Sequence, residues 1–366
     1  MDVKQITGAI EQFAPVIYQE SYDNCGLQVG DNAMVVTGVL LTLDVTEAVL
    51  EEAMQRGCNM IVAHHPLIFT GLKKITGRNY VERIVHKAIK NDIAIYAAHT
   101  NLDNMYNGVN NKIAEKLGLK GLKILAPKAD TLIKLYTSVP VSAADKVREA
   151  LFNAGAGKIG NYKECSFSIN GNGTFRPGQD AGPAIGEAGG IREYVNETKI
   201  EVLIEKHTQA AVIAALFEAH PYEEVAYELI ALPNPNQGIG AGIVGLLPVP
   251  MDEAVFLTYL KSKMNTACIR HTALPGKQIE RVAVCGGSGS FLLFDAIKAK
   301  ADIFITADFK YHQFFDAEGK IIIADIGHYE TEQFTPEIFE AVLKKKFPNF
   351  AVLLSNVLTN PVKYFS

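Results

Sequence analysis

The sequence predicts an α/β protein in two halves, with an inserted ferredoxin-like module of the α+β class between them. In the first and last thirds, short apolar runs alternate with amphipathic helical patterns, which is typical of a sheet covered by helices. In the middle third the order of the patterns becomes β-α-β-β-α-β. A chain of 366 residues is also too long for one ordinary hydrophobic core and is about right for two or three.

The first half of the α/β part covers residues 1–122. Its strands are expected at three short apolar runs: 35–43, 59–63 and 93–97. Its helices are expected at three stretches with apolar residues at helical spacing: 46–56, 80–89 and 109–117. Strands this apolar, separated by helices, indicate a sheet that is buried on both faces.

The inserted module covers residues 123–238. Its strands are expected at 131–138, 164–169, 199–204 and 224–232, and its helices at 143–153 and 208–219. A stretch rich in glycine and proline, 170–190, separates the second strand from the third, and Pro233–Gly238 marks the end of the module.

The second half of the α/β part covers residues 239–366. Buried strands are expected at 281–285, 303–306 and 320–324, and helices at 291–300 and 335–346. The alternation of strand and helix therefore resumes after the insert.

Composition bounds the partners and the compartment. A formal net charge of −5 gives no general attraction to phosphate backbones and argues against a nucleic-acid partner. The apolar runs are shorter than the ~20 residues that cross a bilayer, and the N-terminus lacks the pattern of a secretory signal, so no membrane association is expected. Five scattered cysteines without a CxxC pair favour free thiols and a cytoplasmic location.

Two histidines follow the second apolar run of the first half. His64 and His65 stand where this strand ends, and Pro66 favours an extended backbone at His65. Ligands of α/β sheets gather at the carboxyl ends of the strands. Because neighbouring side chains of a strand point to opposite sides, each histidine could serve one of two adjacent ions.

Two further fragments repeat this arrangement. His99 and Asp103 follow another apolar strand, and His328 and Glu332 follow a third, four residues apart and so on one face of a helix. Each fragment alone could be structural, as an ordinary hydrogen-bonded histidine or helix pair. Together they favour a metal site, and nitrogen with carboxylate oxygen suits zinc, iron, manganese or nickel better than calcium.

Five motifs, in this order and spacing, resemble the Nif-three-like family, also called GTP cyclohydrolase I type 2 homologues: Asp23–Gly30, Ala63–Pro66, His99–Asp103, Thr306–His312 and Gly327–Glu332. The resemblance implies a two-lobed α/β fold, a toroidal homohexamer and a dinuclear metal centre facing an internal cavity. It places the ligands of two divalent ions (zinc, iron or manganese) on five residues, with Glu332 bridging both ions: His64, His65, Asp103, His328 and Glu332.

The middle segment resembles the insert of the longer bacterial members, and its stretch 219–224 resembles one found in CutA-like and PII-like ferredoxin folds. Two positions depart from the family pattern. Tyr22 stands where the family usually shows tryptophan, which alters packing. Ala307 stands where the family usually has glycine. Its methyl group leaves less room for a group to approach the backbone beside the candidate contacts Asp308 and Lys310.

Two histidines are candidate catalytic groups. His99 or His312 could act as a proton shuttle, because a neutral imidazole gives or takes a proton at cellular pH. Either could instead orient a ligand through a hydrogen bond, and for His312 a structural role is favoured. Likewise, 286–290 is interpreted as a tight turn rather than an anion site, and 220–224 as a rigid turn with a packed tyrosine.

These residues predict a metal-dependent hydrolase acting on a small molecule. By resemblance, the reaction would be opening of the guanine ring of GTP with release of formate. Two alternatives remain: a metal-dependent phosphoesterase, and a non-catalytic hexameric scaffold that binds metal and senses a ligand through its insert.

Overall fold

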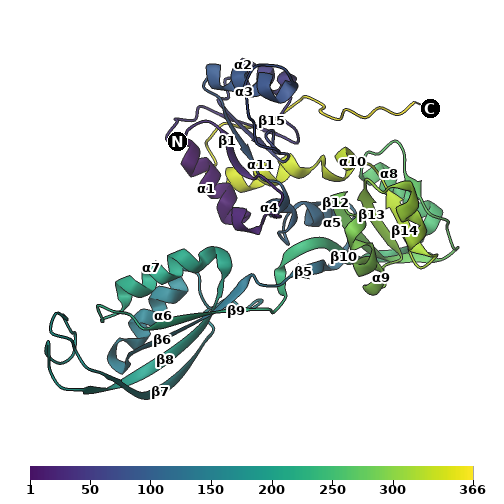
Figure 1. Cartoon of the computed structure of the whole chain (residues 1–366). Helices are drawn as coiled ribbons and strands as arrows, with labels where there is room; N and C mark the ends of the chain where they lie inside the picture. Colours follow the sequence, from purple (N-terminus) through teal and green to yellow (C-terminus); the bar gives the residue numbers. More distant parts are fainter. Residues whose placement is uncertain (366) are drawn as a thin grey trace. The chain divides into compact units, whose positions relative to one another are not determined.

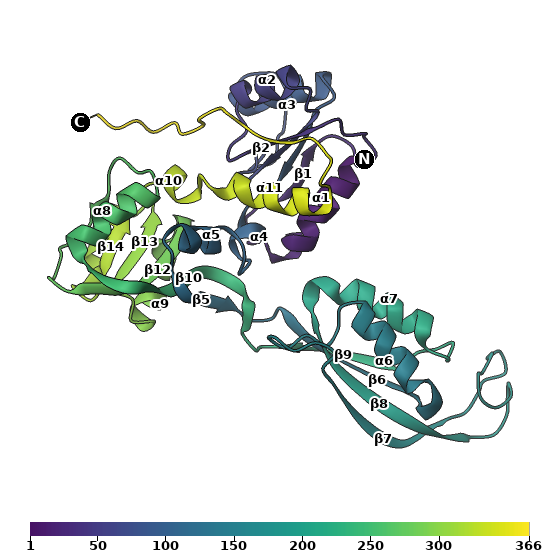
Figure 2. The ribbon, with the colours of Figure 1, turned by 180° about the vertical axis from the view of Figure 1, so that it is seen from behind.

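The computed structural model describes residues 1–365, which form two compact units (Figures 1 and 2). The first unit comprises residues 1–127 and 238–365, and the second comprises residues 128–237. The first unit contains a five-stranded and a six-stranded sheet, and the second contains a four-stranded sheet.

The five-stranded sheet has the order β1-β4-β3-β2-β15. Its strands are β1 (Gly26–Val29), β2 (Val39–Thr42), β3 (Met60–Ala63), β4 (Ala94–Ala97) and β15 (Val352–Leu354). The neighbouring helices are α1 (Val3–Phe13), α2 (Glu47–Gln55), α3 (Tyr80–Lys90), α4 (Thr100–Asp103) and α11 (Thr335–Lys346), with a 3-10 turn, η1 (Val16–Tyr18). Helix α5 (Val109–Lys116) packs against the six-stranded sheet instead. Strands β15, β2, β3 and β4 are parallel, and β1 is antiparallel to β4.

Both faces of this sheet are buried. Leu40 and Ile61 pack with α2 and α3 in one cluster, whereas Leu41 and Val62 join a second cluster that contains α1 and α11. The alternation of side chains along each strand divides the two clusters. The prediction of a doubly covered sheet is therefore confirmed, and side-chain caps from Asp2, Thr46 and Asn79 begin helices α1, α2 and α3.

The six-stranded sheet has the order β11-β14-β13-β12-β10-β5. Its strands are β5 (Lys120–Lys128), β10 (Asn236–Asp252), β11 (Arg270–His271), β12 (Gln278–Ser288), β13 (Ile303–Ala307) and β14 (Ile322–Asp325). Its helices are α8 (Glu253–Lys263), α9 (Leu293–Lys298) and α10 (His328–Glu332), with 3-10 turns η4 (Ser290–Leu292) and η5 (Tyr311–Ala317). The three predicted strands correspond to the parallel strands β12, β13 and β14.

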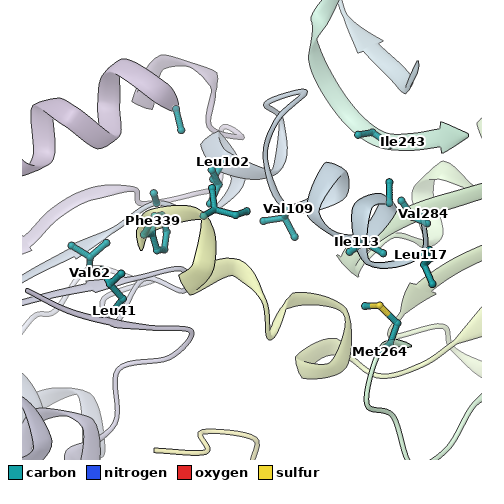
Figure 3. Packing of buried hydrophobic residues seen from close by; sticks show 14 of the residues in the cluster. Leu41, Val62, Leu102, Val109, Ile113, Leu117, Ile243, Met264, Val284 and Phe339 are labelled. Atoms are coloured by element: carbon teal, nitrogen blue, oxygen red, sulfur yellow. The ribbon is translucent and has the colours of Figure 1, made fainter. Parts of the chain in front are cut away.

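One hydrophobic cluster joins the two sheets. Figure 3 shows its side chains from Leu41 and Val62 of the five-stranded sheet, through Leu102 and Val109, to Val284 of the six-stranded sheet. All five are at most 1% exposed. The loops at the ends of both sheets are thereby held on one rigid body.

The second unit has the element order β6 (Leu132–Pro140), α6 (Ala144–Asn153), β7 (Ser166–Phe175), β8 (Glu193–Glu205), α7 (Gln209–Ala219) and β9 (Tyr227–Leu232), with 3-10 turns η2 (Val141–Ala143) and η3 (Lys206–Thr208). Its sheet order is β7-β8-β6-β9, with antiparallel pairs. Strands β7 and β8 are longer than predicted, because the residues after 169, which include glycines, continue to pair with β8 up to Phe175. The likeness of this unit to CutA and PII proteins stays a prediction.

The predicted boundary at 122/123 falls inside a strand. β5 continues through these positions to Lys128, beside β10 in the six-stranded sheet. The compact insert therefore begins a few residues later than the sequence pattern suggested, at 128.

Candidate metal centre

Six metal-ligating side chains meet at the carboxyl ends of three buried strands. His64 and His65 directly follow β3, and His99 precedes the short helix α4, which carries Asp103. His328 and Glu332 are the first and last residues of α10, after β14. Gly327 permits this sharp entry into α10, because its φ of +100° lies in a region that favours glycine.

The ligand atoms form two groups that share Glu332. Oε2 of Glu332 lies 2.9 Å from Nε2 of His65 and 3.1 Å from Nε2 of His328. On the other side, Nε2 of His64 lies 3.6 Å from Oδ1 of Asp103 and 3.8 Å from Oε1 of Glu332. In each group, three ligand atoms lie within 4.8 Å of one another.

His99 joins the same cluster from a third direction. Its ring nitrogen lies within 4.8 Å of ligand atoms of His64 and His65, and its ring centroid lies 5.2 Å from that of His64. The structure thus brings six of the seven predicted site residues together: His64, His65, His99, Asp103, His328 and Glu332.

Each of the four histidines is oriented by a hydrogen bond from Nδ1. The acceptors are the carbonyl of Ala98 for His64 at 2.9 Å, Asp44 for His65 at 2.7 Å, Asp23 for His99 at 2.9 Å, and Asp308 for His328 at 2.6 Å. Because a carbonyl or carboxylate can only accept, Nδ1 carries a proton, and Nε2 is the atom left to bind a metal ion. This is the arrangement by which proteins present histidine to a metal ion.

The cluster passes a direct test of fit to metal ions. Within residues 1–365, four buried ligand atoms make no well-aligned hydrogen bond, although His65 and Glu332 lie at ion-pair distance: Nε2 of His64, Nε2 of His65, Oδ1 of Asp103 and Oε2 of Glu332. Buried polar atoms without partners are rare, because each costs ~1–3 kcal/mol. Divalent cations would satisfy all four atoms, and the donor set is that of zinc, iron or manganese.

The pKa shifts of the clustered side chains also fit a site for metal ions. Burial lowers the pKa of His64 to about 4, and burial together with Glu332 raises the pKa of Asp103 well above its ordinary value. Burial opposes charge at Glu332, but hydrogen bonds from its histidine neighbours lower the pKa of this carboxyl well below its usual range. Without metal, the cluster therefore stores protons that an ion would displace.

The end of β12 lies against the shared carboxylate of Glu332. A Cβ on Gly287, where φ is +61°, would lie 2.4 Å from Oε1 of Glu332. The amide of Gly287 donates to Thr331, and the amide of Gly286 donates to Asn110. Two amides of the glycine-rich stretch 286–290 are thus engaged within the fold. The prediction of a tight turn over the whole stretch is wrong for 286–288, which form the irregular end of β12 and pair with β13 at Ser288.

Two cavities reach the cluster. One of about 230 Å³ is lined by His99, Asp103 and Glu332 and by the exposed aromatic rings of Tyr22 and Phe291. The other, of about 380 Å³, reaches His65. His328 lines both cavities, so the cluster stands between them.

One buried cysteine also lines the first cavity. Burial raises the pKa of the Cys285 thiol above its ordinary value, which favours the neutral thiol.

His312 lies elsewhere. It is an exposed residue of η5, and its ring contacts Tyr311 and Phe315. Within residues 1–365, the groups of ligand atoms around Glu332 do not include it. In the insert, His220 accepts from the amide of Tyr222 and contacts the carbonyl of Ser138, and the hydroxyl of Tyr222 donates to Glu197. This stretch is a packed turn.

Sequence reasoning missed the carboxylates that orient the histidines. Asp44 follows β2 just as His65 follows β3, so the rule that found the histidines could have found Asp44. Asp308 was named only as a contact, and Asp23 only as part of a motif, because hydrogen bonds between distant loops leave no periodic signal.

The Duf34/NIF3 (NGG1p interacting factor 3) family model matches residues 1–361. The chain belongs to this family. A Duf34/NIF3 relative from Halalkalibacterium halodurans is 39% identical over 360 residues, covering 97% of this chain and 96% of the relative. One from Bacillus subtilis is 38% identical over 367 residues, covering 99% and 98%. Both relatives bear the name GTP cyclohydrolase 1 type 2 homolog.

The fold of the Duf34/NIF3 family is confirmed by solved structures. A Bacillus cereus protein related to NIF3 matches with a TM-score of 0.87 and 38% identity, over 100% of this chain and 99% of that chain. A Staphylococcus aureus protein matches with a TM-score of 0.78 and 30% identity, over 100% and 99%. In residues 1–365, no helix has the length and apolar character to span a membrane.

Proposed function

We propose that this chain is a dinuclear metal-dependent hydrolase. The observation that supports this best is the sharing of Glu332, whose two oxygens face two separate groups of histidine and carboxylate ligands. One ion would be held by His64, Asp103 and Glu332, and the other by His65, His328 and Glu332. Three protein ligands per ion leave positions open, as catalytic sites require.

The metals would supply the activation of water at neutral pH and the polarisation of a substrate oxygen. The chain supplies orientation. Asp44 and Asp308 fix the rings of His65 and His328, and Thr331 ties α10 to the end of β12 at Gly287. This framework keeps the carboxylate of Glu332 between the two ligand groups.

His99 is proposed as the acid–base group, with Asp23 as the residue that positions it. Nδ1 of His99 donates to Asp23, so Nε2 can accept a proton beside the ions and return it. Asp23 stays charged for this purpose: burial opposes ionisation, but hydrogen bonds from His99 and Thr100 lower its pKa below the ordinary value.

The substrate is proposed to be a nucleotide, and the reaction to be ring opening with release of formate. The name of the relatives supports the chemistry. The aromatic rings of Tyr22 and Phe291, 65% and 64% exposed at the mouth of the first cavity, are suited to stack on a heterocycle.

The test is metal content followed by a substrate screen. Protein prepared without chelators or a histidine tag should hold about two transition-metal ions per chain by plasma mass spectrometry. Formate released from GTP would support ring opening, and phosphate released instead would favour a phosphoesterase. A metal-loaded protein without turnover would support a binding scaffold, and failure to bind zinc, iron or manganese would exclude the dinuclear hydrolase.

We further propose that the active form is a cytoplasmic homohexamer. The free state of the five cysteines supports a reducing compartment. Light scattering coupled to size exclusion should give the mass of six chains, and the mass of one chain would contradict the hexamer.

A further inference from the structure

The C-terminal segment, residues 355–364, contacts both lobes of the first unit beside the metal centre. After β15 it runs in extended form (Figure 1). Its beginning is fixed on the five-stranded lobe, because Oγ of Ser355 donates to Glu52 at 2.5 Å and the amide of Asn356 donates to the same carboxylate at 3.0 Å. Thr359 and Asn360, a few positions further along, contact residues beside the candidate ligands.

Thr359 reaches the carboxylate that orients His65. Its Oγ1 donates to Oδ2 of Asp44 at 2.5 Å, while Oδ1 of Asp44 accepts from Nδ1 of His65 at 2.7 Å. Each oxygen of the Asp44 carboxylate therefore accepts one hydrogen bond, one from Thr359 and the other from His65. Without the hydroxyl of Thr359, Asp44 could rotate and the ring of His65 would lose its fixed direction.

Asn360, the next residue, reaches the helix that carries the other ligands. Its Nδ2 donates to Oε1 of Glu330 at 3.0 Å, and Glu330 is 7% exposed in the middle of α10. Asn360 is itself fixed, because its Oδ1 accepts from the amide of Val362 at 3.0 Å. Two consecutive residues thus hold the two structural elements that supply one ligand group.

We propose that Thr359 and Asn360 are positioning residues for the second ion, the one assigned to His65, His328 and Glu332. This inference rests on the proposed dinuclear centre. His65 comes from the five-stranded lobe, and His328 comes from the six-stranded lobe. Thr359 orients the first through Asp44, and Asn360 holds the helix of the second through Glu330.

The first ion should not depend on Thr359. Nδ1 of His64 donates to the backbone carbonyl of Ala98, and the backbone carbonyl of Asp103 accepts from Asn110. Neither contact involves residues 355–364. Thr359 should therefore discriminate between the two ions, which a merely stabilising tail would not do. Asn360 holds α10, which also carries the shared Glu332, so its loss should add to the effect of losing Thr359.

The experiment measures the affinity of each ion separately in the full-length protein. Metal-free wild type, Thr359→Val, Thr359→Ser and Thr359→Val/Asn360→Ala are titrated with Co²⁺ against a chromophoric chelator, and bound cobalt is followed by its visible absorption. Leu358→Ala is the matched control, because Leu358 lies in the same segment and is 64% exposed. Thermal unfolding of the metal-free proteins reports the fold.

In Thr359→Val, one of the two equivalents of Co²⁺ should bind about 10–100-fold more weakly while the other keeps its wild-type affinity. The double variant should bind more weakly still. Thr359→Ser, which keeps the hydroxyl, should restore binding, and Leu358→Ala should match wild type. Wild-type affinity for both ions in Thr359→Val, or equal weakening of both, would overturn the inference. A wild type that binds one equivalent or none would instead overturn the dinuclear centre itself.

Discussion

Nδ1 of His99 lies 2.9 Å from Oδ1 of Asp23, a residue 76 positions earlier in the chain. The second oxygen of Asp23 accepts from the amide of Thr100 at 3.0 Å and from the hydroxyl of the same residue. The carboxylate is thus fixed before it orients the imidazole. In the proposed mechanism, His99 and Asp23 serve proton transfer, whereas the other residues of the cluster bind the metal ions. Separate substitutions can therefore test the two roles.

His99→Gln should reduce turnover by about 100-fold or more while both ions remain bound, because the acid–base group is lost and the other ligands stay. Turnover and metal content are measured on the same preparation. His312→Gln is the control and should change neither quantity. Unchanged turnover in His99→Gln would remove this residue from the mechanism.

Glu332→Gln should remove most of the bound metal, because an amide cannot offer two anionic oxygens to two ions. Plasma mass spectrometry after dialysis measures the loss. Glu340→Gln, on α11 and paired with Lys344 at 2.6 Å, should retain full metal content. Loss of one ion alone would show that Glu332 does not bridge.

Asp308→Asn should weaken metal binding about 10–100-fold by removing the charged partner of His328. Competition with a chromophoric chelator gives the affinity. Asp316→Asn, at an exposed position of η5, should behave as wild type. Equal affinities in the two variants would mean that Asp308 does not tune the site.

Gly287→Ala should lower both stability and metal content. The substitution places Cβ 2.4 Å from Oε1 of Glu332 and also strains the backbone at φ +61°. Gly276→Ala is the matched control, because φ is +80° but its Cβ would meet nothing within 4 Å. The control should cost ~1–2 kcal/mol of unfolding free energy and keep its metal. Full metal content in Gly287→Ala would contradict the close approach to Glu332.

The metal-free protein should lose stability as the pH rises above about 6.5, the ordinary pKa of histidine. Burial opposes the charge of His65 and His328, but hydrogen bonds to Asp44, Asp308 and Glu332 raise their pKa values to about 10 and about 11. Their stabilisation is complete below pH ~6.5 and is lost as the pH rises through these values. Burial lowers the pKa of His64 to about 4, so stability also falls as the pH drops from ~6.5 towards 4.

Thermal unfolding between pH 4 and pH 11 measures this profile. Metal-loaded protein is the control, and it should lose the alkaline decline, because bound cations take the place of the protons. A metal-free profile that stays flat from pH 6.5 to pH 11 would show that His65 and His328 are not held in their charged form.

The sequence predicted the buried parallel strands well, because a short continuous apolar run such as 60–63 is typical of a strand that is buried on both faces. It missed β10, whose glycines and prolines hide any alternation, and it missed the antiparallel edge strand β1. It located the candidate ligands because they follow buried strands. It could not pair Thr359 with Asp44, since this contact joins residues 315 positions apart through tertiary structure alone.

The two strands that flank the insert are neighbours in the six-stranded sheet. A Cβ on Gly240 would lie against Ala126 and Pro127, and one on Gly245 against Leu122 and the carbonyl of Lys120, so β5 and β10 run antiparallel. In topological terms, residues 128–237 are an enlarged hairpin loop. A two-residue turn could replace them without rethreading the sheet. Evolution could therefore have gained or lost this module in a single event that left every residue of the metal centre in place.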